Sequence, residues 1–186
     1  MISIEPRLRL ITVAEYYQMI ESKIFPEDEK LELLNGELYK RGESIPLHGG
    51  TINLLRHLFQ KKSNDKIISA QNPLEILPLS VPEPDIAILK FRADHYTQSH
   101  PTPDDVLLLI EVSLSTLEKD KNLKLQLYAA SQIPEYWIVN LEDKCIEVFH
   151  TPDSGQYQAH QSYYKGESIT LHQLEASIKV NEILIN

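Results

Sequence analysis

A single carboxylate interrupts the most apolar segment of this chain, an aliphatic run between positions 105 and 113. Continuous leucine, isoleucine and valine are typical of a strand that is buried on both faces of a sheet. Glu111 lies inside the run, and a buried carboxylate is costly unless a cation, a metal or hydrogen-bond donors compensate its charge. The segment therefore predicts a covered central strand, with Glu111 as the leading candidate for a functional residue.

The rest of the sequence predicts one α/β domain with a mixed sheet, spanning residues 1–186. Thr12 and Glu15 have the spacing of a capping box at the start of a helix over residues 12–21. Asn35-Gly36 is a strong hairpin signal, and residues 115 and 118 repeat the capping-box spacing. The further predicted elements are a hairpin over residues 30–41, helices over residues 47–62 and 115–131, strands over residues 67–70, 74–77, 85–89, 105–113, 136–139 and 145–149, a meander from residue 157, and a helix or turn near residue 171.

Charge and composition narrow the class of protein. The chain has 18 basic and 27 acidic side chains and a net charge of −9, which counts against strong non-specific binding of nucleic acid. Basic residues nevertheless cluster in two places and could simply be solvated helix faces. The clusters are Arg56, His57, Lys61, Lys62 and Lys66, and then Lys119, Lys121 and Lys124.

The single cysteine, Cys145, excludes an intrachain disulfide and a cysteine-based zinc site. No apolar segment approaches the length of a membrane span, and the charged N-terminal residues lack the pattern of a signal peptide. We therefore expect a cytoplasmic protein with no membrane partner.

The helix predicted over residues 115–131 carries a lysine in the middle of its apolar face. At 100° per residue, Lys124 lies among leucines and a tyrosine, whereas Lys119 points away. Asp120 precedes Lys124 by four residues, so one interpretation is an ion pair along the helix, worth a few tenths of a kcal/mol if exposed. We favour the other, in which the Lys124 ammonium is directed at an acidic pocket around Glu111.

Several other polar residues are candidates that carry little weight alone. Asp85 follows a proline at the start of a strand, where both residue types occur without function. His48 lies on the inward face of the second helix, where a lone histidine is more often structural than a ligand. Glu37 and Glu32 share a face of the hairpin, and Glu83, between two prolines, is expected to be exposed.

Carboxylates from neighbouring strands form a set with a specific chemical use. Two or three of them supply the oxygen ligands that Mg²⁺ prefers, while water fills its remaining positions. Such a metal activates a bound water and polarises a phosphoryl oxygen, and a nearby lysine can stabilise charge on the phosphate. The set predicts phosphodiester hydrolysis without a serine or cysteine nucleophile.

The order of these motifs resembles a large bacterial family of restriction-endonuclease-like proteins, formerly a domain of unknown function, in the PD-(D/E)xK nuclease superfamily. The resemblance covers residues 12–149 and implies a restriction-endonuclease-like fold, a central mixed sheet flanked by helices, with an N-terminal helix and hairpin. The matching motifs are the Asn-Gly-Glu hairpin, the histidine helix, Gln71-Asn-Pro-Leu, Pro-Glu-Pro-Asp85, Ile-Glu111-Val-Ser, Leu-Glu-Lys-Asp120, Lys124-Leu-Gln-Leu-Tyr-Ala and Ile133-Pro-Glu-Tyr-Trp-Ile-Val.

The resemblance also implies the site. Asp85 and Glu111 would be catalytic metal ligands, and Glu37 would be a third ligand. The superfamily's usual lysine lies two residues after the second acid, where this chain has Ser113, so Lys124 on the following helix takes that catalytic role. The supporting residues would be His48, Glu32, Gln71, Ser113 and Asp120.

The activity that follows is that of an endonuclease, a hydrolase that uses Mg²⁺, or alternatively Mn²⁺, to cleave nucleic acid, with DNA as the expected substrate. One alternative is a catalytically inactive nuclease-fold module that binds nucleic acid or a protein partner, as the basic cluster over residues 56–66 suggests. Another is a structural homodimer whose acids form a buried ion-pair network, which the inward Asp120 and Lys124 would allow.

Overall fold

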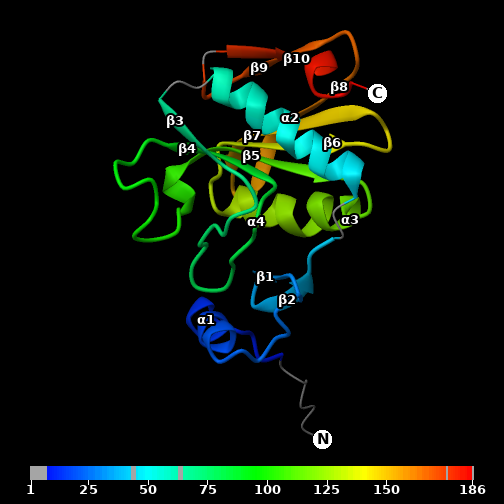
Figure 1. Cartoon of the computed structure of the whole chain (residues 1–186). Coiled ribbons are helices and arrows are strands. Elements are labelled where there is room, and N and C mark those ends of the chain that lie inside the picture. The colour runs from blue at the N-terminus through cyan, green and yellow to red at the C-terminus, as the bar shows by residue number, and fades with distance from the viewer. Residues whose placement is uncertain (1–7, 43–44, 63–64, 175, 186) are drawn as a thin grey trace, which may run out of the picture.

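The computed structural model describes residues 8–42, 45–62, 65–174 and 176–185 and shows a mixed sheet with helices on both faces (Figure 1). In chain order the elements are α1 (Val13–Glu21), β1 (Leu31–Leu34), β2 (Glu37–Lys40), α2 (Pro46–Lys62), β3 (Lys66–Ser69), β4 (Ile86–Lys90), the 3-10 helix η1 (Pro103–Asp105), β5 (Val106–Ser113), α3 (Leu117–Lys119), the π-helical segment η2 (Asp120–Lys124), α4 (Leu125–Ala130), β6 (Glu135–Asn140), β7 (Cys145–Asp153), β8 (Gln156–Tyr163), β9 (Ser168–Leu171), β10 (Ala176–Lys179) and the 3-10 helix η3 (Val180–Glu182).

The central sheet has six strands in the order β3-β4-β5-β6-β7-β8. Among the described strands only β5 and β6 pair in parallel, and the helical stretch from α3 to α4 makes the crossover that a parallel pair requires. The hairpins β1-β2 and β9-β10 form separate two-stranded sheets. The predicted mixed sheet is therefore confirmed.

The alternation of side chains along β5 divides its residues between two cores. Ile110 and Val112 pack with α2, whereas Leu109 lies in the cluster beneath α4, on the same side as Glu111. All eight residues of β5 are buried, as the aliphatic run predicts. Burying one such leucine or isoleucine stabilises the fold by roughly 1.5–3 kcal/mol, so the strand that carries Glu111 is anchored from both sides.

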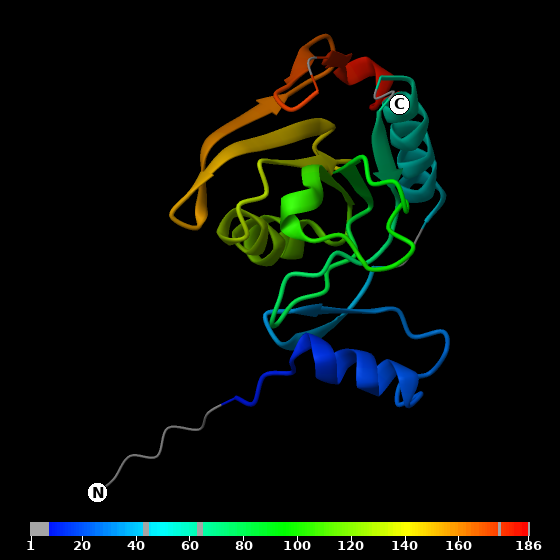
Figure 2. The same ribbon diagram turned by 90° about the vertical axis from the view of Figure 1, so that its left-hand side faces the viewer.

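The N-terminal helix and hairpin form a lobe beside the sheet, at the bottom of Figure 2. The predicted capping box is present, since the Thr12 N–H donates to the Glu15 carboxylate at 2.9 Å. The lobe docks through backbone hydrogen bonds onto residues 78–81, including one from the Val81 N–H to the Leu33 carbonyl at 2.7 Å. This contact brings β1 to the end of the sheet where β4 begins.

Two predictions about secondary structure were wrong in detail. Residues 74–77 form no strand, because prolines flank the segment and Ile76 makes only an isolated bridge to Ser80. The third helical stretch begins at Leu117 rather than at residue 115, and its predicted capping box is absent, since Thr116 is the N-cap. Near residue 171, where a helix or a turn is predicted, strand β9 ends and a turn over residues 172–174 follows, which confirms the turn.

The extent of a single domain over residues 1–186 stays a prediction. Within the described part of the chain, no helix is both long enough and apolar enough to cross a membrane.

The hairpin turn offers a test of the docked lobe. Gly36 has a φ of +82°, and a Cβ at this position would lie 2.5 Å from the Leu10 Cβ. We expect Gly36→Ala to lower the free energy of unfolding by roughly 2–4 kcal/mol, measured by urea denaturation, from backbone strain and overpacking together. Gly155→Ala is the matched control, because Gly155 also has a positive φ (+77°) but has open space around it. Equal losses in the two variants would contradict the close packing of Leu10 on the turn.

Candidate active site

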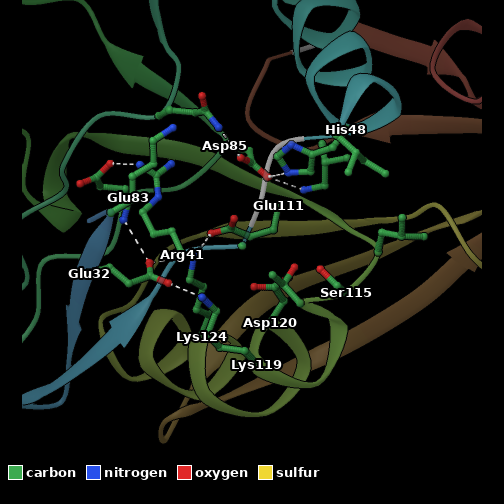
Figure 3. A pocket seen from close by; sticks show the side chains of 17 residues that line it. Glu32, Arg41, His48, Glu83, Asp85, Glu111, Ser115, Lys119, Asp120 and Lys124 are labelled. Atoms are coloured by element: carbon green, nitrogen blue, oxygen red, sulfur yellow. Dashed lines mark hydrogen bonds and ion pairs between the residues drawn. The ribbon is translucent and has the colours of Figure 1, made fainter. Parts of the chain in front are cut away.

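A pocket of about 220 Å³ lies where β4 begins, β5 ends and the first turn of α2 approaches η2 (Figure 3). It is lined by 17 residues, and most of its polar lining consists of acids and bases from five separate parts of the chain. Those with charged or titratable side chains are Lys30, Glu32, Arg41, His48, Glu83, Asp85, Glu111, Lys119, Asp120 and Lys124.

Strand register brings two of the predicted residues together. Ile86 of β4 pairs with Ile110 of β5, and the same antiparallel register continued by one residue places Asp85 opposite Glu111. Directly opposed residues in such a pair have Cβ atoms about 5 Å apart. Asp85 and Glu111 are only 6% and 4% exposed, so two buried carboxylates face one pocket from adjacent strands.

Asp85 is held by donors on both of its oxygens. The Val112 N–H donates to Oδ2 at 2.9 Å, His48 Nε2 lies 3.1 Å from the same oxygen, and Gln71 Nε2 donates to Oδ1 at 3.2 Å. Burial acts to raise the pKa of Asp85, but the hydrogen bonds from His48 and Val112 outweigh it and leave this pKa lowered. The hydrogen bond to Asp85 likewise raises the pKa of His48. Asp85 is therefore a fixed, ionised carboxylate.

Glu111 has a different environment, which contains one cation. Lys124 Nζ lies 2.9 Å from its Oε1, and the Tyr128 hydroxyl donates to the same oxygen at 3.0 Å. Burial raises the pKa of Glu111 to about 8, against the lowering effect of Lys124. Burial alone would lower the pKa of Lys124, but the attraction of Glu111 and Glu32 outweighs it and this pKa is raised. Lys124 is therefore a buried, charged ammonium, as its place on the apolar face predicts.

The hairpin supplies a different glutamate from the one predicted as a metal ligand. Glu32 is 1% exposed and pairs with Lys124 at 3.1 Å and with Lys119 at 2.5 Å. Glu37 is exposed, accepts a hydrogen bond from the Tyr39 hydroxyl at 2.6 Å, and does not line the pocket. Because β1, not the start of β2, is held against residues 81–83, the structure brings Glu32 to Asp85 and Glu111 and leaves Glu37 outside.

Asp120 and Ser113 form a buried pair beside these residues. The hydroxyls of Ser113 and Thr116 each donate to Asp120 Oδ2 at 2.7 Å. No ion pair joins Asp120 to Lys124, although both lie in the described residues. The interpretation that we did not favour, an ion pair along the helix, is therefore wrong, and Lys124 reaches instead to Glu111 on the strand and Glu32 on the hairpin. Ser113 therefore orients Asp120.

Lys119, Arg41 and Glu83 line the pocket, although the sequence did not place them there. Lys119 lines the pocket instead of pointing away, because the Leu125 N–H donates to the Asp120 carbonyl five residues back in a π turn. In that turn, residues five apart share a side, so Lys119 lies beside Lys124, which an α-helical wheel cannot show. Arg41 pairs with Glu83, and both are only partly exposed, contrary to the prediction for Glu83. No local pattern in the sequence indicated this long-range pair.

The carboxylate oxygens of the pocket suit a cation that keeps several bound waters better than one that is surrounded by protein ligands alone. Within the described ranges, no three histidine, cysteine, aspartate or glutamate side chains converge closely enough to hold a metal ion. Mg²⁺, however, is often held by one or two carboxylates and keeps several waters. Four acids around the pocket are buried, at residues 32, 85, 111 and 120, and Lys124 is the one buried cation among the described residues. The whole lining has five acids against four lysine and arginine side chains and His48, so the oxygen donors of Asp85 and Glu111, and not an excess of negative charge, favour a metal beside them.

Comparison with known proteins identifies the relatives. A crystal structure of a putative nuclease belonging to DUF820 from Anabaena variabilis ATCC 29413 matches with a TM-score of 0.73 and 12% sequence identity, over 94% of this chain and 98% of that chain. This likeness confirms the restriction-endonuclease-like fold predicted from the sequence. No curated protein matched the chain. Residues 13–181 match the model of the family Uma2, described as a putative restriction endonuclease, and the chain therefore belongs to this family.

Proposed function

We propose that the chain is a metal-dependent endonuclease that hydrolyses phosphodiester bonds in DNA, with Mg²⁺ as its cofactor and Mn²⁺ as an alternative. The observation that carries the proposal is the convergence of Asp85, Glu111 and Lys124 on one pocket, with Lys124 Nζ 2.9 Å from the Glu111 carboxylate. Membership of the Uma2 family supports a nuclease activity. A cytoplasmic location remains a prediction from the sequence.

In this proposal Asp85 and Glu111 hold the metal, and Glu32 pairs with Lys124 and Lys119 instead of serving as the third ligand first expected of Glu37. When bound, Mg²⁺ supplies a water of lowered pKa and polarises a phosphoryl oxygen. The hydrogen bonds from His48 and Val112 keep Asp85 ionised and aimed into the pocket.

Lys124 supplies the fixed positive charge. Glu111 and Glu32 keep its ammonium protonated and hold it in the pocket. A preorganised cation stabilises the negative charge that develops on a phosphate during hydrolysis, and it is strongest where water is excluded. Lys124 is 3% exposed, so it meets that condition.

The test is cleavage of supercoiled plasmid by the purified protein with Mg²⁺ or Mn²⁺. We expect nicked and linear products, no reaction in EDTA, and a rate lowered about 10²- to 10³-fold by Glu111→Gln. Glu147→Gln is the control, because Glu147 is also a buried acid on the central sheet but pairs with Lys121 outside the pocket. Cleavage by Glu111→Gln protein at the wild-type rate would show a contaminating nuclease and remove the proposal.

A second candidate is a module that binds nucleic acid without cutting it. The exposed basic residues of α2 favour it, and it predicts binding that EDTA leaves unchanged, with no cleavage in any metal. The homodimer stays a prediction, although the ion-pair network it invoked exists within one chain, through Lys124, Glu111 and Glu32.

A further inference from the structure

The longest helix that the structure describes in this acidic protein carries no acid at all. The 17 residues of α2 include no aspartate or glutamate, although the chain as a whole has a net charge of −9. The buried face of α2 packs on the sheet through Ile52, Leu55 and Phe59. Its opposite face is exposed and entirely polar or basic beyond the first turn, at positions that recur every three or four residues. These exposed residues are Gly50, Asn53, Arg56, His57, Gln60 and Lys61.

Two basic side chains on this face have no ionic partner among the described residues. Arg56 and Lys61 make no ion pair with any residue that the structure describes. By contrast, Lys62 at the edge of the face donates to the Ser177 carbonyl at 3.0 Å and helps to hold β10. Figure 2 shows α2 along the outer side of the sheet, with no described element covering it. The charges of Arg56 and Lys61 are thus available to a partner.

Gly50 on the same face has no structural reason to be glycine. A Cβ at this position would meet no atom within 4 Å, and the backbone is not left-handed. Glycine inside a helix is less stable than alanine, because it loses more conformational freedom on folding. The usual remaining reason for a glycine is close approach of a ligand to the backbone. Gly50 lies two residues after His48 and five after Ile45, which both line the pocket.

We propose that the exposed face of α2, from Gly50 to Lys61, docks the sugar-phosphate backbone of duplex DNA and leads it into the pocket. The inference rests on the proposed nuclease function, whose substrate it positions. Twelve residues of helix extend about 18 Å, and duplex DNA carries one phosphate charge per about 1.7 Å of its axis. An acid-free stripe of this length can therefore place Arg56 and Lys61 on two phosphates of one duplex, in a protein whose overall charge would otherwise repel DNA.

The first test measures binding alone. Anisotropy of a labelled 20-base-pair duplex is titrated with protein in EDTA at several NaCl concentrations, for the wild type and for Arg56→Gln/Lys61→Gln. At about 50 mM salt we expect binding at least tenfold weaker in the variant, and a plot of log K against log salt that is shallower by about 1.8 for two lost phosphate contacts. Lys144→Gln/Lys165→Gln, which removes the same charge from exposed lysines elsewhere, should bind like the wild type.

The second test separates binding from stability. Gly50→Gln fills open space on an exposed helix face, so it should raise the melting temperature while weakening binding of the duplex at least threefold. A merely structural role for this position would move both measurements in the same direction or leave binding unchanged. The proposal is overturned by wild-type affinity in Gly50→Gln and in Arg56→Gln/Lys61→Gln, by equal losses in both double variants, or by tighter binding of duplex RNA.

The two proposals can fail separately. Cleavage that is lost in every metal while binding still depends on Arg56 and Lys61 would remove the nuclease and keep the docking face. Metal-dependent cleavage with binding unchanged in the α2 variants would remove the docking face and keep the nuclease.

Discussion

Replacing Lys124 by methionine is expected to lower the rate of Mg²⁺-dependent plasmid cleavage about 10²- to 10³-fold. Methionine keeps much of the length of the side chain but removes the ammonium that lies 2.9 Å from Glu111 and 3.1 Å from Glu32. The pocket then has no buried positive charge among its described residues to stabilise a phosphate. Initial rates of nicking at saturating metal measure the loss.

The same change breaks a buried ion pair, so stability has to be measured beside activity. Removing one partner of such a pair costs about 3–5 kcal/mol when the other stays charged, and the raised pKa of Glu111 reduces this cost because the glutamate can take up a proton. The double variant Lys124→Met/Glu111→Gln should regain much of the unfolding free energy without regaining activity.

Lys121→Met is the control for Lys124→Met. Lys121 lies in the same π-helical segment, but it pairs with Glu147 at 2.7 Å and does not line the pocket. We expect this variant to retain cleavage within about twofold, since Lys121 lies outside the pocket. Wild-type rates in well-folded Lys124→Met protein would exclude a catalytic role for this lysine.

Replacing Asp85 by asparagine is expected to weaken the binding of Mn²⁺ and Mg²⁺ at least about 100-fold, since changes to the partners of ligands alone already cost 10- to 100-fold. The amide keeps the shape of the side chain and an oxygen for the hydrogen bond from Val112, but it loses the charge. Calorimetric titration of metal into the protein without nucleic acid measures the affinity. Cleavage should fall in parallel.

Asp94→Asn controls for the loss of one negative charge. Asp94 pairs with Arg92 at 2.7 Å in the loop after β4, away from the pocket. Its variant should bind metal like the wild type. If Asp85→Asn also keeps wild-type affinity, Asp85 does not hold the metal.

Much of this fold was predictable because local signals and global packing agree. The aliphatic run around Glu111 became a fully buried strand, and the Asn35-Gly36 turn became a hairpin. The segment over residues 74–77 was misread, because apolar residues between prolines look like a strand but have no neighbour with which to form a ladder. Patterns of one element predict that element, but not whether a partner strand is available.

The sequence predicted the site residues whose positions follow from the regular alternation of side chains along a strand. It did not predict those whose positions depend on an irregular helical turn or on contacts between distant parts of the chain. Asp85 and Glu111 meet because a regular antiparallel register places them opposite each other. Lys119 was misplaced because a π turn changes the helical phase ahead of Lys124. Glu32 and Glu37 share a face of the hairpin, so only the docking of the lobe could decide between them.

The docking of the N-terminal lobe ties the site to the folding of distant parts of the chain. Glu32 meets Lys119 and Lys124 across 87 and more residues of sequence, while the largest sheet holds together through contacts of its own. Local opening of the lobe, at a cost below that of global unfolding, would therefore remove one acid from Lys124 and leave β4 to β8 paired. If the chain has the proposed activity, that activity is then lost at a lower denaturant concentration than the one that unfolds the central sheet. The stability of the lobe therefore sets the conditions in which the molecule stays active.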